Sequence, residues 1–449
     1  MPTNCYNKAM KPRPKAPKVE EYIPKPGIDL VQVLQLSAHE ANRTDRYLSW
    51  EELRYRRAPQ PLDSEGWWVG LKLHRMQARQ NLPLKDRKGG AFSYTVTRMM
   101  QSLLHQIDMQ GGGILHASNQ HLLSETDRNR YLLTSLMDEA IMSSLLEGAA
   151  VTRAEAKELL RSNRSPLNTH ERMVTNNYRT MQLLMSWKDA PLTRERILSL
   201  HRTMTEGTIP LEKSGALRTD ADKVRIEASA SGEIVHIPPP ADTLPERLDA
   251  LCAFANNEDG EYMHPVLRAI MLHFWLAYDH PFIDGNGRTA RALFYWAMLK
   301  SGYWLFEYIS ISQEIYRHAK SYYNAFIHSE EDDNDLNYFL TDQLTTIHHS
   351  ISSLLEHLKQ RSAEQTELNS RLKDRLEFNH RQKALLAEML KNPDIRTSVT
   401  AHCREFNTVR QTARTDLTAL VAAGMLLVHK QGNEFIYTPA ANLKQLISG

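Results

Sequence analysis

Cysteine is scarce in this chain of 449 residues, which has only Cys5, Cys252 and Cys403. Three scattered cysteines exclude a disulfide-framed secreted fold, and without a closely spaced pair they also argue against a zinc site. The first residues lack the apolar segment of a signal peptide. These absences predict a protein of the reducing cytoplasm.

Long apolar runs and an excess of one charge are missing too. No run reaches the roughly 20 residues that a membrane helix needs. A net charge of +2 gives no global attraction to nucleic acid or lipid. With 41% hydrophobic and 24% charged residues, the composition is that of an ordinary globular protein without a membrane partner. The length allows about three domains on the usual size scale.

What the chain does have is a dense polar motif near its middle, residues 280–291, which reads His-Pro-Phe-Ile-Asp-Gly-Asn-Gly-Arg-Thr-Ala-Arg. The flanking residues 265–278 and 290–299 are rich in apolar and aromatic types, as buried helices are. The motif is therefore predicted to be a loop that enters a helix N-terminus, where free N–H groups and the helix dipole favour an anion. Gly285 and Gly287 let the backbone turn and let a bulky oxyanion approach it.

The side chains of this motif suit phosphate chemistry. Arg288 and Arg291 are three residues apart, so one helix face presents both guanidinium groups. Asp284 is a hard oxygen ligand of the kind that holds Mg²⁺ beside phosphates. His280 can act as a general base near pH 7. An EF-hand calcium loop is excluded because its first position would be Phe282, and a Walker A loop is excluded because Gly-Lys-Ser/Thr is absent.

At every fixed position, the motif matches the signature His-x-Phe-x-Asp/Glu-Gly-Asn-Gly-Arg-x-x-Arg of the Fic domain family, which the chain resembles over about 130–345. The resemblance implies a mainly α-helical core with a small β-hairpin flap. It also implies transfer of AMP from ATP to a Ser, Thr or Tyr hydroxyl of a target protein, or of the chain itself, with release of pyrophosphate. The related Doc branch phosphorylates instead and typically replaces the motif glycines, which this chain keeps.

The same resemblance assigns roles residue by residue. His280 would deprotonate the hydroxyl, Asp284 would hold Mg²⁺ on the α- and β-phosphates, and Arg291 would hold the γ-phosphate. Tyr323 would lie near the adenine, although an aromatic pair on a helix is more often core. The anion hole would be formed by Gly285, Asn286, Gly287 and Arg288.

A flap is expected ahead of the motif. Residues 214–219 resemble the Gly-x-x-Arg element that precedes the flap in the family, and residues 224–237 read as a hairpin that three prolines end. In the family this hairpin docks the target as an added strand. Glu227 stands where many relatives have glycine, which leaves the register open, and an ordinary surface hairpin is the alternative. The expected docking residues are Ile226, Ile234, Val235, His236 and Ile237.

A second, looser motif lies upstream of the core. Residues 138–148 read as a helix that a glycine ends, and Ser143-x-x-x-Glu147-Gly matches the inhibitory Ser/Thr-x-x-x-Glu-Gly/Asn pattern of the Fic class with an N-terminal inhibitory helix. A carboxylate paired with Arg291 would block the γ-phosphate position. The resemblance therefore implies autoinhibition, and the alternative is a Glu147 that faces solvent at a helix end.

The C-terminal part predicts a separate unit. It reads as three helices, at 381–389, 397–406 and 408–423, and then two strands, at 425–429 and 434–437. This order resembles a winged helix-turn-helix, whose third helix reads the major groove of duplex DNA. The expected DNA contacts are Arg410, Gln411 and Arg414. Winged helices also bind proteins, and Asp416 and Glu434 would reduce the positive charge.

Five segments are thus expected along the chain. They are a mobile basic Pro-rich tail (1–27), an N-terminal helical domain (28–129), the Fic core (130–345) with the inhibitory helix near 138–147, a connecting helix (346–378) and the winged helix domain (379–449). Gly111-Gly112-Gly113 is the break that suggests the second border.

Two classes of function stay open. The first is an autoinhibited protein adenylyltransferase, and the second is a DNA-binding regulator whose Fic core senses nucleotide. His280 favours the enzyme, because binding of a nucleotide alone needs no base. The same site could also remove AMP, with Glu147 positioning a water. A homodimer is compatible with each of these functions.

Overall fold

The computed structural model describes residues 14–41, 46–111, 125–227, 232–374, 377–391, 393–431 and 434–448. The chain divides into two compact units, Met1–Ser352 and Ser353–Gly449. The described part is mainly α-helical, as the sequence predicts, and holds three small sheets. No helix in these ranges is both long and apolar enough to cross a membrane.

The first unit begins with an N-terminal layer of helices and one hairpin. Part of this layer lies within residues 1–27, which the sequence predicts to be a mobile tail. Tyr22 is buried with Trp67 and Trp68, so the prediction of a mobile tail over 1–27 is wrong for the segment that contains it, and residues 1–13 lie outside the described part. An antiparallel hairpin, in which Leu82 and Leu84 point inward, was not predicted although its sequence alternates. The elements of this layer are α1 (Val19–Tyr22), α2 (Leu30–Ala41), α3 (Trp50–Leu53), α4 (Ser64–Gln77), β1 (Gln80–Lys85), β2 (Ala91–Tyr94) and α5 (Arg98–Gly111).

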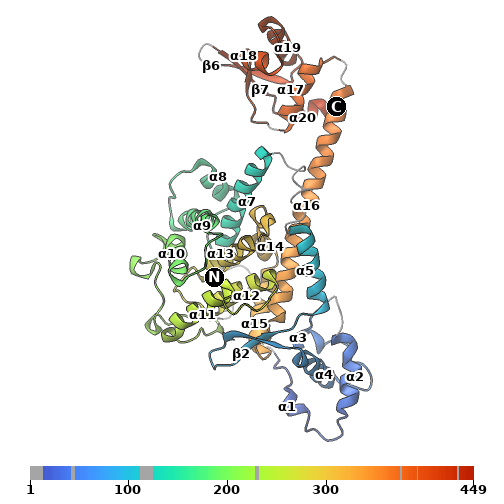
Figure 1. The fold of residues 1–449 in the computed structure, drawn as a ribbon, viewed down its shortest axis with the longest axis vertical. Coiled ribbons are helices and arrows are strands. Elements are labelled where there is room, and N and C mark those ends of the chain that lie inside the picture. The colour runs from blue at the N-terminus through green and yellow to red at the C-terminus, as the bar shows by residue number, and fades with distance from the viewer. Residues whose placement is uncertain are drawn as a thin grey trace. The chain divides into compact units, whose positions relative to one another are not determined.

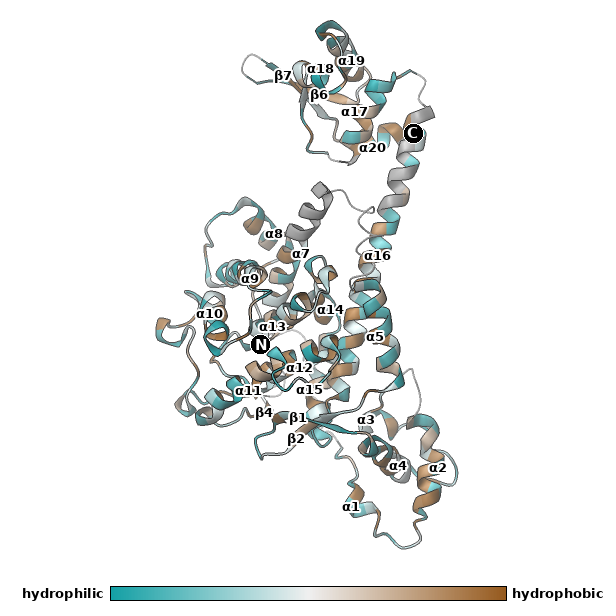
Figure 2. Ribbon diagram, viewed as in Figure 1, coloured by the Kyte–Doolittle hydropathy of each residue, from teal (hydrophilic) through white to brown (hydrophobic). Residues whose placement is uncertain are grey.

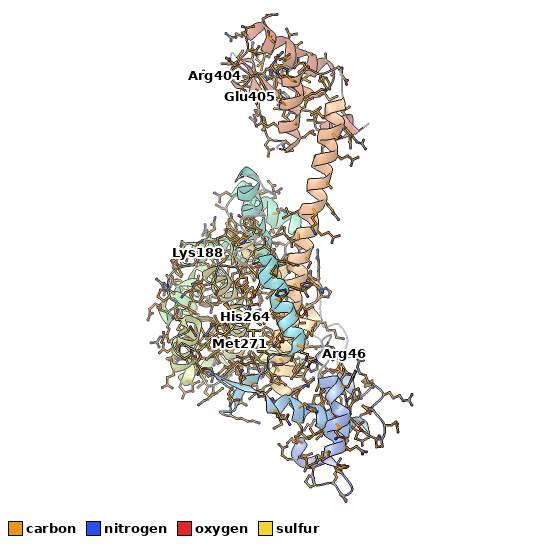
Figure 3. The ribbon with its side chains drawn as sticks, turned by 45° about the vertical axis from the view of Figure 1, so that its right-hand side comes forward. Arg46, Lys188, His264, Met271, Arg404 and Glu405 are labelled. Atoms are coloured by element: carbon orange, nitrogen blue, oxygen red, sulfur yellow. The ribbon has the colours of Figure 1, made fainter. Side chains whose placement is uncertain are left out.

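The predicted border at 129/130 falls inside a helix, α7 (Glu125–Leu146), and both sides of it belong to the first unit. The N-terminal layer also packs on the core. The Nε2 atom of His264, a residue that lies beside α5 in Figure 3, is 3.0 Å from the Asp108 carboxylate of α5. The layer is therefore part of the same unit, while Gly112 and Gly113 lie outside the described residues.

The rest of the first unit surrounds a central pair of helices (Figure 1). The helices α12 (Pro265–Asp279) and α13 (Asn286–Lys300) are buried nearly all round, which is typical of helices at the middle of a large core. The helices of this part are α8 (Arg153–Ser162), α9 (Thr169–Ser186), α10 (Arg194–Thr205), α11 (Leu244–Asn256), α12 (Pro265–Asp279), α13 (Asn286–Lys300), α14 (Ile311–Arg317) and α15 (Ala319–Glu331). One further helix, α16 (Asn337–Asp374), begins in the first unit and ends in the second. Short 3₁₀ turns lie at Leu211–Lys213, Asp220–Asp222, Ala241–Thr243 and Trp304–Glu307, and the flap consists of β3 (Ile226–Glu227) and β4 (Ile234–His236).

The second unit has its own core. Leu386 and Met389 pack with Leu417 and Leu420. The apolar residues of α17 (His380–Lys391) and α20 (Leu443–Ser448) are brown in Figure 2. Its sheet has the order β5-β7-β6, with Val428 opposite Tyr437. The elements are α17 (His380–Lys391), β5 (Thr397–Ser398), α18 (Val399–Glu405), α19 (Arg410–Ala422), β6 (Leu426–Gln431), β7 (Glu434–Pro439) and α20 (Leu443–Ser448).

This order differs from the prediction in two details. The second helix begins at Val399 and not at 397, because Thr397 and Ser398 pair with β7 and the Ser398 hydroxyl caps the helix. The last helix, α20, was not predicted. The winged helix-turn-helix remains a prediction that agrees with the order of elements.

Candidate active site

The motif is a tight loop between α12 and α13. His280 ends α12 in the left-handed conformation, with φ 45°, and Gly285, with φ 80°, precedes α13. Because α13 begins at Asn286, four residues before the apolar pattern, Gly287 and Arg288 lie in its first turn. No side chain caps this turn. The structure thus places the motif at a helix N-terminus, as the sequence predicts, with backbone N–H groups left to bind an anion.

His280 is held as a neutral base. Its Nδ1 lies 3.2 Å from the carbonyl oxygen of Ala277. A carbonyl only accepts, so Nδ1 carries the proton and Nε2 is the basic nitrogen. Burial, and then the nearby His236, lower the pKa of His280 to about 4. At neutral pH the ring is therefore uncharged and can accept a proton.

Arg218, from the Gly-x-x-Arg element, fixes the loop from behind. Its Nε donates to the carbonyl oxygen of His280 at 2.8 Å, and Nη2 donates to the carbonyl of Pro239 at 2.6 Å. Its backbone N–H donates to Pro281 at 2.9 Å. The buried guanidinium of Arg218 thus ties the backbone of His280 to Pro239, which follows the flap, and its N–H holds Pro281.

His201 of α10 is a site residue that sequence reasoning missed. Its Nδ1 accepts from the N–H of Gly215 at 3.0 Å, so its Nε2 must donate to the carbonyl of Asp284, 2.9 Å away. The ring stacks on Phe282 with 3.7 Å between centroids. Burial lowers the pKa of His201 to about 4, which keeps it neutral. A lone histidine on an amphipathic helix gives no local signal of this role.

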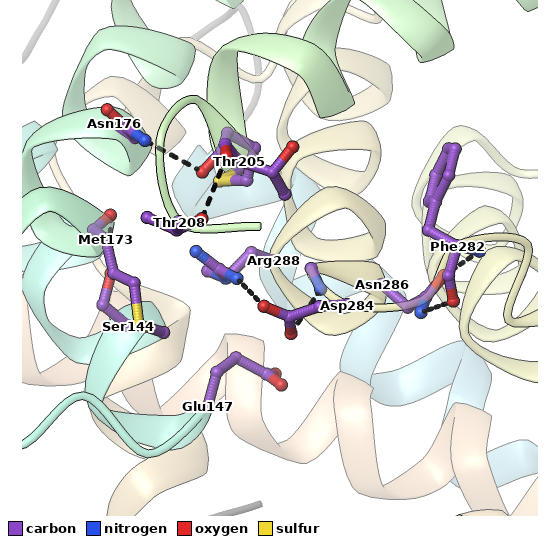
Figure 4. A network of polar contacts seen from close by, with 12 residues as sticks. Ser144, Glu147, Met173, Asn176, Thr205, Thr208, Phe282, Asp284, Asn286 and Arg288 are labelled. Carbon is purple, nitrogen blue, oxygen red and sulfur yellow. Dashed lines mark hydrogen bonds and ion pairs between the residues drawn. The ribbon is translucent and has the colours of Figure 1, made fainter. Parts of the chain in front are cut away.

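Asn286 and Asp284 shape the loop as well as facing the site. The Asn286 amide accepts from Phe282 N at 2.9 Å and donates to Phe282 O at 2.8 Å (Figure 4). Its side chain is therefore occupied, and only its backbone N–H is left for an anion hole. Asp284 accepts from Gly285 N at 2.7 Å and keeps a side chain that is 47% exposed.

Asp284 presents one partly exposed carboxylate at the loop, a hard oxygen donor of the kind that Mg²⁺ takes. The described residues contain no group of three or more His, Cys, Asp or Glu side chains that could hold an ion. Mg²⁺ is commonly bound by one or two carboxylates together with water and substrate phosphates. Asp284 would supply that single carboxylate.

Arg288 is buried, and part of its guanidinium has no acceptor among the described residues. The residue is 1% exposed, and its one described contact is 3.3 Å long, from Nη2 to the Asp284 carboxylate. Its Nε and Nη1 are buried without a hydrogen-bond partner among the described residues. Buried unpaired N–H groups cost free energy, and phosphate oxygens are acceptors of the kind that a guanidinium binds well.

Arg291, in contrast, is engaged by α7, the helix that was predicted to inhibit, and by Glu147 directly after it. Its Nε donates to the Ser143 hydroxyl at 2.8 Å, and Nη2 donates to the Ser143 carbonyl at 3.0 Å and to the Glu147 carboxylate at 2.9 Å. The structure thus brings together the residues that the sequence pattern paired.

Glu147 also lies directly over the first turn of α13. A Cβ atom built on Gly287 would be 2.1 Å from Oε1 of Glu147. The carboxylate therefore occupies space that only a glycine leaves open, and Figure 4 shows it pointing toward the loop that carries Asp284. Glu147 faces the site, and the alternative of a solvent-facing residue at a helix end does not describe it.

The flap residues divide into two groups. Ile234 and Ile237 are 44% and 50% exposed, whereas Ile226 and Val235 are partly buried. His236 points inward and must be corrected from a docking residue to an anchor.

The His236 ring bonds on both sides. Nδ1 is 2.8 Å from the Glu330 carboxylate, and Nε2 is 2.7 Å from the carbonyl of Tyr278. Both of its nitrogens are engaged, so it holds β4 on α12 and α15.

The aromatic pair on α15 also divides. Tyr322 is buried, and its hydroxyl is 2.9 Å from His273 Nε2. Tyr323 is only partly buried, and its ring lies 5.3 Å from that of Tyr322. The more accessible ring is the one assigned to the adenine.

In the second unit, α19 carries Arg410, Gln411 and Arg414 as exposed side chains. Asp416 is 3% exposed and receives hydrogen bonds of 2.7 Å from both Arg381 and Asn379. The expectation that Asp416 weakens the basic surface is therefore wrong, since its charge is buried and paired.

The comparisons with known proteins point to one family. Residues 191–298 match the model of the Fic/DOC family. The chain is 30% identical over 164 residues to the protein adenylyltransferase Fic of Drosophila ananassae and 32% identical over 116 residues to that of Nematostella vectensis. These matches cover 35% and 26% of this chain but 31% and 25% of the relatives, so the chain spans less than a third of their length.

A solved structure agrees on the fold. A Fic family protein from Desulfovibrio desulfuricans G20 superposes with a TM-score of 0.51 and 18% identity, over 78% of this chain and 98% of that one. A likeness at this identity shows a shared fold. Residues 191–298, which match the Fic/DOC family model, contain the whole motif loop and nearly all of the helix that it enters.

Proposed function

We propose that the chain is an autoinhibited protein adenylyltransferase that moves AMP from ATP to a Ser, Thr or Tyr hydroxyl of a target protein. The observation that carries this proposal is the buried Arg288 in the first turn of α13, whose Nε and Nη1 have no hydrogen-bond partner in the described part of the chain. A neutral His280 six residues before Asn286 supplies the base that binding alone would not need.

The residues of the site perform the transfer in one displacement. His280 Nε2 takes the proton of the attacking hydroxyl, whose oxygen forms a bond to the α-phosphorus. The bond from that phosphorus to the oxygen bridging the α- and β-phosphates breaks, and pyrophosphate leaves. Bound ATP brings negative charge close to His280, and this charge raises the pKa of the ring from its resting value toward neutrality, where a base works best.

The remaining side chains hold the phosphates. Arg288 and the backbone N–H groups of the first turn of α13 bind oxygens on which charge develops. Arg291 binds the γ-phosphate once Glu147 has left it. Asp284 would hold Mg²⁺, which neutralises phosphate charge when bound.

Inhibition is a competition for Arg291. A charge-assisted hydrogen bond of the kind between Arg291 and Glu147 contributes about 1.5–3 kcal/mol, which corresponds to roughly tenfold or more in the competent population. In the resting chain the carboxylate holds the guanidinium that the γ-phosphate needs, so the chain alone transfers AMP slowly.

The test is incubation of the purified protein, with and without a cell lysate, with ATP labelled either at the α- or at the γ-phosphate. Label on protein from the α position alone is expected. Label from the γ position would indicate a kinase and would contradict the proposal.

The position of Glu147 supports a second reaction at the same site, the removal of AMP from a modified protein. Its side chain is 25% exposed and lies over the anion-binding turn, where a carboxylate can orient a water for attack on an AMP–protein bond. Release of AMP from a modified protein by the wild-type chain, but not by the Glu147→Gly variant, would support removal of AMP.

The C-terminal unit supports a further role in binding duplex DNA. Arg410, Gln411 and Arg414 share one exposed stretch of α19, and the one acidic residue of this helix, Asp416, is buried. Phosphate contacts release counterions, so affinity should fall steeply as salt rises. In a gel-shift titration, Arg410→Gln should lower the salt slope by about one, while Lys359→Gln on α16 serves as the charge-matched control. A chain that binds no duplex at low salt would favour a protein-interaction role or a nucleotide sensor without DNA.

A further inference from the structure

The segment ending in Glu147 contacts α13 in a regular register. Glu139, Ser143 and Glu147 are spaced four residues apart, and they meet Tyr295, Arg291 and Gly287, which are also four apart and run in the opposite direction. Positions four apart share one face of a helix. The two helices are therefore antiparallel neighbours joined by three successive contacts, of which only the last two reach the phosphate site.

The first of these contacts is the best satisfied. The Glu139 carboxylate accepts from the Tyr295 hydroxyl at 2.8 Å, from the Ser310 hydroxyl at 2.8 Å and from Ser312 N at 3.1 Å, and the Ser312 hydroxyl also donates to it. Glu139 is 2% exposed and Tyr295 is 1% exposed. A buried carboxylate with several donors is held firmly in place, because losing the donors would leave its charge unpaired.

Ser143 of α7 bonds to Arg291 and Asp138 pairs with α8, while further polar contacts of α7 hold it on α9. Asn177 of α9 donates to the carbonyl of Ala140 at 3.0 Å, and the Ser144 hydroxyl lies 3.4 Å from the carbonyl of Met173. These bonds join α7 to α9 and do not set its position along α13. Glu139 joins α7 to α13 and to α14 together.

We propose that Glu139 is a positioning residue that sets the register of α7 on α13 and thereby directs Glu147 onto Arg291. This inference rests on the proposed inhibition of the Fic site. Glu139 lies eight residues before Glu147, about 12 Å along the helix, so it acts on the phosphate site only through α7. Weakening its contacts frees Arg291 in a larger fraction of molecules, although Glu147 itself is still present.

The experiment measures self-labelling from α-labelled ATP in three variants of the full chain. Glu139→Gln keeps the shape but places an amide against donor groups, and labelling should rise about threefold or more, though less than in Glu147→Gly. Tyr295→Phe removes one hydroxyl and should give a smaller rise. Asp138→Asn is the matched control, because Asp138 pairs with Arg153 and Lys157 of α8 at 3.1 and 3.6 Å and makes no described contact with α13. It should label as wild type does.

A double variant separates positioning from a merely structural role. In a Glu147→Gly background, Glu139→Gln should add nothing, because the residue it positions is gone. General damage to the fold would instead lower labelling in both backgrounds, and that result would overturn the proposal. So would wild-type labelling in Glu139→Gln and Tyr295→Phe when Glu147→Gly is active.

The affinity for ATP tests the positioning role of Glu139 without relying on transfer of AMP. Freed Arg291 should tighten the affinity for unlabelled ATP about threefold in Glu139→Gln, measured by calorimetric titration. If Glu147→Gly transfers no AMP, the proposed function fails, but tighter binding in both variants would still support the positioning role. Unchanged affinity in Glu139→Gln beside a gain in Glu147→Gly would overturn it.

Discussion

Arg288 and Arg291 are both buried and lie on one face of α13, but they differ in how many of their N–H groups the protein itself binds. Arg291 makes three hydrogen bonds to α7 and the residue after it, whereas Arg288 keeps two buried nitrogens without a described partner. The protein thus supplies an anion of its own to one arginine and leaves the other prepared for a ligand. In the proposed function, ATP binds first at Arg288, and transfer requires the release of Arg291.

The largest effect is expected from substitution of His280, the proposed base, which acts on the nucleotide that both arginines would bind. His280→Ala, made in a Glu147→Gly background, should lower transfer about 10²- to 10⁴-fold, the usual contribution of a general base. ATP affinity should change little, because His280 precedes the anion-binding turn. Transfer rates and ATP titrations on the same samples check this, and full transfer by His280→Ala would remove the residue from its assigned role.

Next in size is the release of Arg291. Glu147→Gly should raise self-labelling from α-labelled ATP about tenfold or more, since the charge-assisted pair is lost. Arg291→Ala should cancel the gain, because the γ-phosphate needs the same guanidinium. A folded, ATP-binding Glu147→Gly protein that labels no better than wild type would show that the carboxylate does not compete with phosphate.

The two arginines should separate in binding. In the wild-type background, Arg288→Gln should weaken ATP affinity roughly tenfold, the scale of one charged hydrogen bond. Arg291→Gln should cost less, because Arg291 is already occupied by Glu147. After Glu147→Gly the two substitutions should cost similar amounts. Equal losses in the wild-type background would contradict the contrast between a prepared and an occupied arginine.

The last prediction concerns the pH dependence of stability and not the reaction. His201, which holds the Asp284 carbonyl, has its pKa lowered to about 4 by burial. The unfolded chain then binds more protons than the folded chain between about pH 4 and 6.5. Stability should therefore fall as the pH drops through that window, by up to roughly 3 kcal/mol from this residue.

The measurement is the urea midpoint at pH 7 and pH 5 for the wild type and for His201→Gln. The variant should lose part of the difference between the two pH values. An identical pH dependence in both proteins would show that His201 is not buried as a neutral clamp.

Local patterns predicted the site better than they predicted its support. The loop, the helix it enters and the pairing of Glu147 with Arg291 follow from short motifs whose residues are close in sequence or fit a known pattern. The supports act over long separations: Arg218 reaches across 62 residues, His201 across 83 and Glu139 across 156. Periodicity and spacing within a segment do not reveal these contacts, because they form only when distant segments pack together.

Errors elsewhere have similar causes. The tail was predicted from its Lys and Pro content, but Tyr22 within it fills a space beside two tryptophans of α4. Asp416 was counted with the surface charge because sequence alone does not show that Arg381, 35 residues away, buries it. In both cases tertiary contacts outweigh what composition favours.

The missing side chain at Gly287 has a consequence for how the chain responds to nucleotide. The Glu147 carboxylate and the γ-phosphate of ATP would occupy the same space beside Arg291. Because Glu147 belongs to the same chain, its effective concentration at this position is fixed. Occupancy by the phosphate then depends on how the concentration of ATP compares with that fixed value. Under the proposed competition, the fraction of chains able to transfer AMP rises with the concentration of ATP, and any change that loosens the segment carrying Glu147 lowers the concentration needed.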